Sequence, residues 1–418
     1  MNAFVPADIL LPRVDSLEKW AVIACDQFTS QPEYWQRIRE YVGDAPSTLR
    51  LVLPEAELGV EDDQRASAIR AEMDQLLNSG RFCEYRNAMI YVERTLLSGK
   101  VRKGLVGAVD LEAYDYQEGS VSPIRASEKT VVERIPPRKK VRQGASLELP
   151  HVLMLCDDDE RVLIEPVTAV RESLPKLYDF NLMEGGGHIA GWLVQGEALS
   201  AFEGRLEAYA QAVDKKYAGM NGASVLFAVG DGNHSLATAK ACYEDQKRGL
   251  TLREALALPS RWALVELENI HDEAQEFEPI HRLVLTEEPD ALLQRMRQEI
   301  GAEKGYPVQW MAGMKSGTVY LDERLGPLPV GILQAFLDRY MAEHPCGIDF
   351  IHGEEALKQL AARDGAVGLM LPAIDKGGLF RGIVADGVLP RKSFSMGHAQ
   401  EKRYYLEARR ICSQESNA

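Results

Sequence analysis

The sequence lacks any apolar run that approaches the roughly 18 to 20 residues needed to cross a bilayer. At the N-terminus, Pro6, Asp8 and Pro12 interrupt the stretch where a signal peptide needs continuous apolar residues. The 6 cysteines occur singly, without a CxxC pair and without the Cys and His spacing that tetrahedral zinc requires. We therefore expect neither a membrane partner nor export, and we expect reduced thiols in a cytoplasmic protein.

An excess of basic residues is also missing. Lys and Arg total 48 against 63 Asp and Glu, which gives a net charge of -15 over 418 residues. Such a charge repels phosphate backbones and anionic lipid, so we expect no nucleic-acid partner. Hydrophobic residues make up 45% of the chain and charged residues 27%, the proportions of a globular protein with a packed core.

The pattern of apolar residues predicts a mixed α/β fold, with mixed sheets and flanking helices. An apolar run over 21–25 precedes helix-spaced Trp35, Ile38 and Val42, which places Asp26 between a strand and a helix. Other strands are expected over 89–97, 101–111, 151–156, 162–164, 224–229, 262–267, 282–285, 318–321, 348–351, 367–371 and 380–384. Helices are expected over 69–77, 199–217, 292–300, 332–341, 354–362 and 399–411. We expect one domain over 1–418, and a division into two lobes, 1–120 and 121–418, stays open.

A basic segment interrupts this acidic chain between residues 125 and 142. It contains Glu128 and Glu133, with two prolines between its charges. Its basic residues are Arg125, Lys129, Arg134, Arg138, Lys139, Lys140 and Arg142. Charge runs of this kind are usually solvated surface segments. The alternative is a loop that faces phosphate, and the sequence leaves both interpretations open.

The strongest local pattern is GDGNHS at residues 230–235, between the strand expected over 224–229 and a helical run. Its glycines permit positive φ angles and close approach of a ligand to the backbone. The helix start adds unpaired N–H groups and a partial positive charge, which suit a phosphate. Asp231 could then hold Mg²⁺ through a carboxylate oxygen, and His234 could donate to phosphate or carry a proton. The alternative is a plain strand-to-helix turn with Asp231 as its N-cap.

Three other segments have simpler explanations. Residues 184–187 are more typical of a tight turn or bulge than of a Rossmann fingerprint, because no buried parallel strand precedes them. Residues 390–398 lack the G-x-S-x-G pattern, which excludes a hydrolase of the nucleophile-elbow type. His281 and Arg282 suit recognition of a carboxylate or phosphate, although an ordinary surface pair explains them equally well.

Four ordered motifs together resemble the family called domain of unknown function 1015. They are SEKT at 127–130, GDGNHSLATA at 230–239, EPIHR at 278–282 and RKSFSMGH at 391–398. The resemblance spans nearly the whole chain and implies that this family's domain fills the protein. The central motif of the family is in turn similar to the glycine-to-His-Arg phosphate loop of the ParB and sulfiredoxin-like superfamily, which also contains free-serine kinases.

The resemblance implies a nucleotide site at the central motif. The residues around the phosphates would be Gly230, Gly232, Asn233 and Ser235. Ser235 stands where the superfamily usually has Arg, and the loss of a guanidinium removes a bidentate phosphate contact. Another basic group must then supply the charge. The candidates are Arg125, Lys129, Arg134 and Arg282. Asp26 falls where many family members have an Asp after Tyr, which makes it the candidate base.

We therefore predict an enzyme, an ATP- or ADP-dependent kinase that uses Mg²⁺ and phosphorylates a small hydroxyl substrate, with free L-serine as the expected acceptor. Asp26 or Glu128 would accept the hydroxyl proton, and His234 would serve as a further catalytic group. The basic residues of 125–142 would close over the nucleotide, and His281 with Arg282 would bind the substrate carboxylate. Two alternatives are a nucleotide-binding switch without catalysis, as in ParB-like proteins, and a structural protein whose motifs only shape loops.

Overall fold

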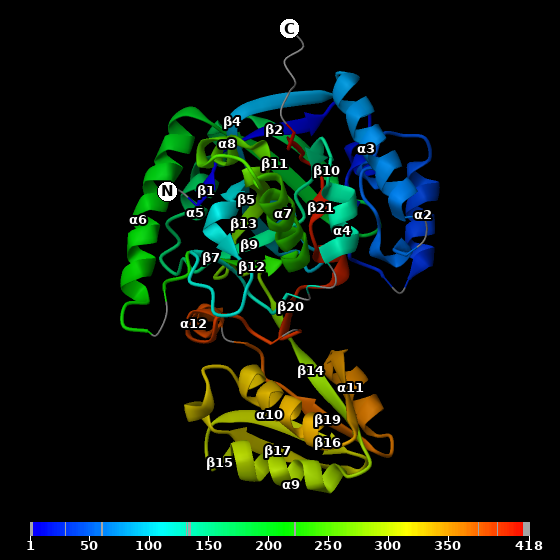
Figure 1. Ribbon diagram of the computed structural model, residues 1–418, viewed down its shortest axis with the longest axis vertical. Coiled ribbons are helices and arrows are strands. Elements are labelled where there is room, and N and C mark those ends of the chain that lie inside the picture. Colours follow the sequence, from blue (N-terminus) through cyan, green and yellow to red (C-terminus); the bar gives the residue numbers. More distant parts are fainter. Residues whose placement is uncertain are drawn as a thin grey trace.

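The computed structural model describes residues 3–29, 31–59, 62–130, 132, 135–220, 223–374, 376–390 and 392–412. It has the mixed α/β architecture predicted from the sequence, with an 11-stranded sheet, a 7-stranded sheet and helices around them (Figure 1). The predicted strand, glycine turn and helix around residues 230–235 are present. Within the described ranges, no helix combines the length and the apolar character that a membrane crossing needs.

The larger sheet is built from the first two thirds of the chain and carries the turn at residues 230–235. Its strands are β1 (Phe4–Val5), β2 (Ala7–Pro12), β4 (Phe82–Thr95), β5 (Val101–Asp110), β6 (Tyr114–Asp115), β7 (Ile124–Ala126), β9 (Leu153–Cys156), β10 (Lys176–Asn181), β11 (His188–Val194), β12 (Phe227–Asp231) and β13 (Trp262–Asn269). They follow the order β10-β11-β4-β5-β13-β9-β12-β7-β6, with β1 beside β5 and β2 beside β4. The pairs β13 with β9 and β12 with β7 are parallel, whereas the hairpin β4 with β5 is antiparallel. The sheet is therefore mixed, as expected.

Helices flank this sheet, with α6 along one side of the molecule and α2 and α3 along the other (Figure 1). They are α1 (Leu17–Trp20), α2 (Pro32–Val42), α3 (Asp62–Asn78), α4 (Ile135–Arg142), α5 (Glu165–Val170), α6 (Gly196–Lys216), α7 (Asn233–Gln246) and α8 (Leu252–Ala257). Trp35, Ile38 and Val42 form the buried stripe of α2, because residues three and four apart share a helix face. Helix α4 packs against α3 and α7, which brings the basic segment to the region of the glycine turn.

The smaller sheet is antiparallel and is built from residues after 276. Its strands are β14 (Phe277–Thr286), β15 (Gly301–Ala302), β16 (Tyr306–Ala312), β17 (Lys315–Leu321), β18 (Cys346–His352), β19 (Ala366–Met370) and β20 (Phe394–Met396), and its helices are α9 (Pro289–Ile300), α10 (Pro329–Glu343) and α11 (Glu354–Ala361). The strand order is β15-β17-β16-β19-β14-β18, with β20 beside the start of β14. The division between the two sheets falls between Asn269 and Phe277, so it does not coincide with residue 120, and strands from both sides of that residue share the larger sheet.

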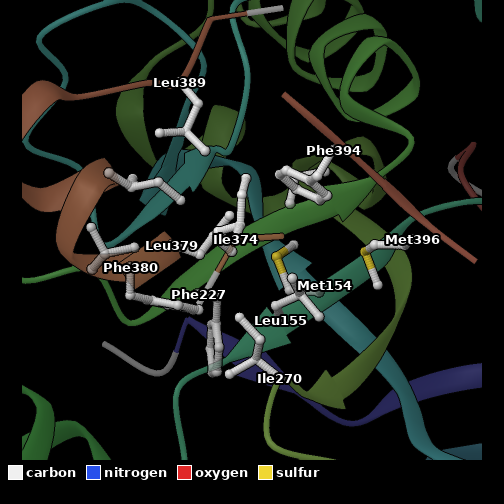
Figure 2. Close-up of a cluster of buried hydrophobic side chains, with 14 of the residues drawn as sticks. Met154, Leu155, Phe227, Ile270, Ile374, Leu379, Phe380, Leu389, Phe394 and Met396 are labelled. Carbon is white, nitrogen blue, oxygen red and sulfur yellow. The ribbon is translucent and has the colours of Figure 1, made fainter. Parts of the chain in front are cut away.

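A buried apolar cluster joins the two sheets (Figure 2). Met154, Leu155 and Phe227 come from β9 and β12 of the larger sheet. Leu379 and Phe380 come from helix α12 (Lys376–Asp386), which lies at the junction with β20. Because these side chains are excluded from water together, the position of α12 and β20 is fixed relative to the turn that follows β12.

Three local predictions are wrong. Residues 380–384 belong to α12 and are not a strand, and residues 162–164 form no strand before α5. Both were short apolar runs, for which periodicity does not separate strand from helix. The third error is the helix expected over 399–411, which is an extended segment with β21 (Tyr404–Tyr405) paired to β3 (Val22–Ile23) and β22 (Arg409–Arg410) paired to β8 (Leu147–Glu148). This segment is buried on nearly all sides, so its apolar spacing did not report a helix face.

Candidate functional site

The turn after β12 gives the site its backbone. Strand β12 ends at Asp231, Gly232 takes the left-handed conformation at φ 82°, and α7 begins at Asn233. A Cβ at residue 232 would lie 3.1 Å from Cδ2 of His151 and 3.1 Å from Cα of Val152, so glycine is required here for two reasons. The N-cap is Gly232, with no side-chain cap, so Asp231 does not cap the helix as the simpler interpretation proposed. The helix start therefore presents its N–H groups beside His151, where an anion is favoured.

An acidic and a basic side chain meet beside this turn. Asp26 follows β3, and its Oδ2 lies 3.2 Å from Nε2 of His151, which is buried. Nδ1 of His151 shares a hydrogen bond of 2.9 Å with the Tyr405 hydroxyl, and the backbone N–H of Cys25 donates to the same oxygen over 3.2 Å. Tyr405 lies on β21, which pairs with β3 and so holds both ends of this network in register.

The charges of Asp26 and His151 stabilise one another. Burial alone would raise the pKa of the Asp26 carboxyl, but the His151 imidazole, the amide of Gln27 and the ammonium of Lys402 outweigh it and hold the pKa well below its ordinary value. Burial would lower the pKa of His151, but the Asp26 carboxylate reverses this and raises it well above its ordinary value. The pair is therefore a carboxylate and an imidazolium at neutral pH.

Lys402 extends the charged cluster to the glycine turn. Its Nζ lies 3.4 Å from Oδ2 of Asp231, and it also lowers the pKa of Asp26, so one buried ammonium serves both carboxylates. Lys402 is 8% exposed, which means that its charge acts in a weakly screened environment. We call Asp26, His151, Asp231, Lys402 and the start of α7 the charged site.

Buried polar atoms without hydrogen bonds gather in the charged site. Among the described residues, Oδ1 of Asn233 is buried and has no hydrogen-bond partner. Oδ2 of Asp231 and Nε2 of His151 are also buried, and each meets only its ion-pair partner, Lys402 or Asp26. The side chain of Asn233 forms a hydrogen bond through its Nδ2, which donates to Oγ of Ser127 over 3.5 Å. A buried polar atom without a hydrogen bond typically lowers the free energy of unfolding by about 1 to 3 kcal/mol. Oδ1 of Asn233 is therefore expected to meet a ligand, a cation or water.

The carboxylate of Asp231 determines how Mg²⁺ would bind in the charged site. Across the described ranges, no group of three or more His, Cys, Asp or Glu side chains is arranged to hold a metal ion. Mg²⁺ commonly binds through one or two carboxylates together with substrate phosphates and water, and Asp231 offers one carboxylate, whose Oδ2 forms an ion pair with Lys402 and no hydrogen bond. The residues present therefore fit a magnesium ion that arrives with a nucleotide and do not fit a resident metal centre.

A cavity of about 130 Å³ opens beside the charged site. Cys25, His151 and Tyr405 line it together with Ser235 and Thr238 of the first turns of α7. Its remaining walls are largely apolar and come from residues 51–58, α3, α4 and residues 145–149. Ser235, a residue of the predicted phosphate loop, thus lines a small, partly open cavity.

The other residues of the central motif divide into two groups. His234 lies half-buried in the first turn of α7, and its carbonyl accepts the Thr238 hydroxyl over 2.7 Å. Gly230 faces the apolar junction instead, because a Cβ there would lie 2.5 Å from Sδ of Met396 and 2.9 Å from Leu155. Gly230 is therefore needed for packing, whereas Gly232 is needed at the site.

Glu128 holds the backbone and does not reach the charged site through any contact of the described residues. Its carboxylate accepts the N–H groups of Lys392 and Ser393, each over 2.9 Å. Burial raises the pKa of Glu128, and these N–H groups only partly offset the effect. Both oxygens of Glu128 thus accept backbone N–H groups, and the residue anchors the segment before β20.

The predicted basic groups are also engaged elsewhere. Arg125 is buried on β7, where its guanidinium donates to the carbonyls of Ser122 and Ala223, and burial lowers its pKa. Lys129 is exposed and lies 3.5 Å from Glu118. Arg134 lies outside the described residues. The second half of the basic segment is largely helix α4, and its basic side chains pair with acidic partners, which are Arg138 with Glu55, Lys139 with Asp245, Lys140 with Asp63 and Arg142 with Glu148.

His281 and Arg282 lie in the smaller sheet, away from the residues of the charged site. Nδ1 of His281 accepts the N–H of Leu371 over 3.2 Å, and burial lowers the pKa of this imidazole. Arg282 is fully buried and donates to the side chain of Gln334 over 2.8 Å and to the carbonyl of Lys392 over 3.0 Å. Both residues therefore hold the fold at the junction, and neither contacts Asp26 or Asp231.

Sequence reasoning missed two residues of the charged site, His151 and Lys402, and Tyr405, which shares a hydrogen bond with His151. His151 is an isolated histidine at a strand start, and no motif pointed to it. Lys402 and Tyr405 lie in the segment predicted to be helical, and their roles depend on the pairing of β21 with β3. Only the Lys-Arg pair at 402–403, directly after the last family motif, offered a signal.

Replacing His151 with Gln is expected to destabilise the protein by an amount that depends on pH. Because the pKa of His151 is raised, its ion pair contributes fully below the unfolded pKa of about 6.5 and is lost as the pH rises through the folded value. Because the pKa of Asp26 is lowered, the contribution is also lost below about pH 3.9, as the pH falls through the folded value. Urea unfolding should give a larger difference between wild type and His151→Gln at about pH 5.5 than at about pH 10. Equal differences at both values would contradict a charged pair.

Comparison with known proteins adds the following. The family model described as protein of unknown function (DUF1015) matches residues 9–411, and no curated protein matches the chain. A mutant of a free serine kinase in complex with AMP is similar, with 10% identity and a TM-score of 0.37 over 70% of this chain and 92% of that chain. SbnI with a C-terminal truncation, from Staphylococcus aureus, has 11% identity and a TM-score of 0.35 over 74% and 83%. A conserved hypothetical protein from Pyrococcus furiosus has 11% identity and a TM-score of 0.32 over 70% and 91%. These TM-scores lie below 0.5, and the likenesses therefore assign no function to this chain.

Proposed function

The chain belongs to the DUF1015 family of proteins of unknown function, and for this member we propose a nucleotide-dependent phosphotransferase that acts on a small hydroxyl substrate. The observation that carries the proposal is the buried Oδ1 of Asn233, which has no hydrogen-bond partner at the start of α7, beside the ion pairs of Asp26 with His151 and of Asp231 with Lys402. Phosphoryl transfer requires mainly positioning and neutralisation of charge, and this cluster supplies groups for both.

The start of α7 would hold the phosphates. Its N–H groups and its partial positive charge favour an anion, and Gly232 supplies the left-handed conformation from which the helix starts. Lys402 would supply the positive charge that Ser235 does not, in place of the Arg usual in the superfamily. Asp231 would hold Mg²⁺, which when bound would neutralise charge on the nucleotide phosphates.

Asp26 would serve the acceptor. Its lowered pKa keeps it ionised at neutral pH, so its oxygens can orient a substrate hydroxyl and take its proton. Glu128 does not share this role, because its carboxylate is engaged by backbone N–H groups. We propose free L-serine as the acceptor, since the central motif resembles that of a superfamily that includes free-serine kinases.

A direct assay tests the proposal. The full chain is mixed with ATP or with ADP, Mg²⁺ and L-serine, and phosphoserine is sought by mass spectrometry. We expect product with one of the two nucleotides. Nucleotide binding measured by calorimetry, together with no product from either nucleotide, would instead support a switch that binds nucleotide without catalysis. Failure to bind either nucleotide would contradict both functions.

A further inference from the structure

The cavity beside the charged site is too small for a nucleotide. Its volume is about 130 Å³, and an apolar protein cavity of about 150 Å³ holds a molecule of the size of benzene. A nucleotide has several times as many atoms, so only a compact molecule fits completely. Since Ser235 at the start of α7 and His151 of the charged site both line this cavity, a molecule inside it would lie beside the proposed phosphate site.

One ion pair in the wall is suited to a molecule that carries both signs of charge. Arg138 of α4 and Glu55 form this pair, and their side chains are 18% and 15% exposed. The backbone N–H of Glu55 donates to the carbonyl of Cys25 over 2.8 Å, which ties the pair to the loop that carries Asp26. The Arg138–Glu55 pair is complementary to an amino acid zwitterion. When the two lie side by side and antiparallel, the guanidinium meets the ligand's carboxylate and the Glu55 carboxylate meets its ammonium.

The second ion pair in the wall is committed to the fold. Glu148 accepts from Arg142, from Arg409 and from the backbone N–H of Leu264, so its oxygens are used within the protein. Apolar side chains such as Leu53, Met73 and Val141 make up much of the remaining wall. A charged molecule enters such a cavity only if each of its charges finds a partner, since an unpaired buried charge is costly.

We infer that this cavity binds a free hydroxy amino acid as a zwitterion, with its carboxylate on Arg138, its ammonium on Glu55 and its hydroxyl toward Cys25 and His151, the lining residues next to Asp26. The inference rests on the proposed function and names the substrate-binding groups of the same site. The residues that bind the substrate's charged groups are then Arg138 of the basic segment and Glu55. They replace His281 and Arg282, which are buried in the smaller sheet. The apolar walls then limit the acceptor to side chains about as small as that of serine.

Two variants and two fragments of serine test this assignment. We expect Arg138→Gln and Glu55→Gln each to weaken L-serine binding at least tenfold in calorimetry with the full chain, because each leaves one charge of the zwitterion unpaired. Ethanolamine, which lacks the carboxylate, should bind Arg138→Gln as it binds wild type but should lose affinity for Glu55→Gln. Hydroxypropionate with its hydroxyl on C3, which lacks the ammonium, should show the opposite pattern. Lys139→Gln, on the same helix and paired with Asp245, is the matched control and should change nothing.

The outcomes separate this inference from the proposed function. Any one of three results would overturn the zwitterion site: no binding of L-serine to wild type, unchanged affinity of L-serine for both variants, or the same pattern of affinities for ethanolamine and hydroxypropionate. Another hydroxyl acceptor could then still be phosphorylated. If L-serine binds through Arg138 and Glu55 and no nucleotide phosphorylates it, the zwitterion site stands and the phosphotransferase fails. Thermal unfolding of each variant, expected near the wild-type midpoint, shows that a loss of binding is not a loss of fold.

Discussion

Replacing Asp26 with Asn should lower the rate of phosphoryl transfer by about 10² to 10⁴-fold, the usual contribution of a general base. The amide keeps the shape of the side chain but cannot take the proton of a substrate hydroxyl. It also removes the charge that raises the pKa of His151. Nucleotide affinity should change by only a few fold, because the start of α7 and Lys402 are unaltered. Steady-state kinetics and calorimetry on the same preparation measure the two quantities.

Asp63→Asn on helix α3 is the matched control for this variant. Asp63 is exposed and pairs with Lys140 on the surface, so the same change of charge should leave the rate unaltered. A rate for Asp26→Asn within a factor of about three of wild type would exclude Asp26 as the base. An equal loss of nucleotide affinity would instead assign Asp26 to nucleotide binding.

Replacing Arg403 with Leu should reduce the free energy of unfolding by about 3 to 5 kcal/mol, the cost of leaving buried charges uncompensated. Nη1 of Arg403 lies 2.7 Å from Oε2 of Glu266, and its Nη2 pairs with Glu407. All three side chains are at most 2% exposed. The residue also lies between Lys402 and Tyr405, so its loss should loosen the segment that completes the charged site. Urea unfolding measures the first effect, and L-serine and ADP binding measure the second.

Arg324→Leu supplies the comparison for Arg403. Arg324 pairs with Asp322 over 2.6 Å, but its side chain is 88% exposed, so its removal should cost less than about 1 kcal/mol. If the two variants lose similar stability, then burial is not what makes the Arg403 pairs important. A large loss of stability in Arg403→Leu without any loss of L-serine or ADP binding would show that the C-terminal segment does not contribute to the site.

The sequence predicted those parts of the site that depend on local chemistry. The turn at Gly232 could be expected, because glycine readily takes the left-handed conformation that joins a strand directly to a helix. Asp26 was also placed correctly between a strand and a helix. These features are fixed by a few adjacent residues, so one sequence contains the information.

The remaining parts depend on contacts between distant residues, which a single sequence does not report. Lys402 reaches Asp231 only because β21 pairs with β3, a contact across nearly the whole chain. Arg282 and Glu128 both looked like site residues, since charged groups in family motifs suit binding. They instead hold the backbone around Lys392 from two sides, and nothing in their local sequence separates that role from binding.

The central claim is that the start of α7 binds the phosphates of a nucleotide, and one calorimetric comparison tests it. Asn233→Asp places a carboxylate at the first residue of the helix with almost no change of shape, and two unit charges about 4 Å apart repel by about 1 to 4 kcal/mol. Gln211→Glu, at an exposed position of α6, changes the net charge by the same amount far from the motif. We predict that ADP binds wild type and Gln211→Glu equally and binds Asn233→Asp at least tenfold more weakly. Equal affinity for all three proteins would contradict the account.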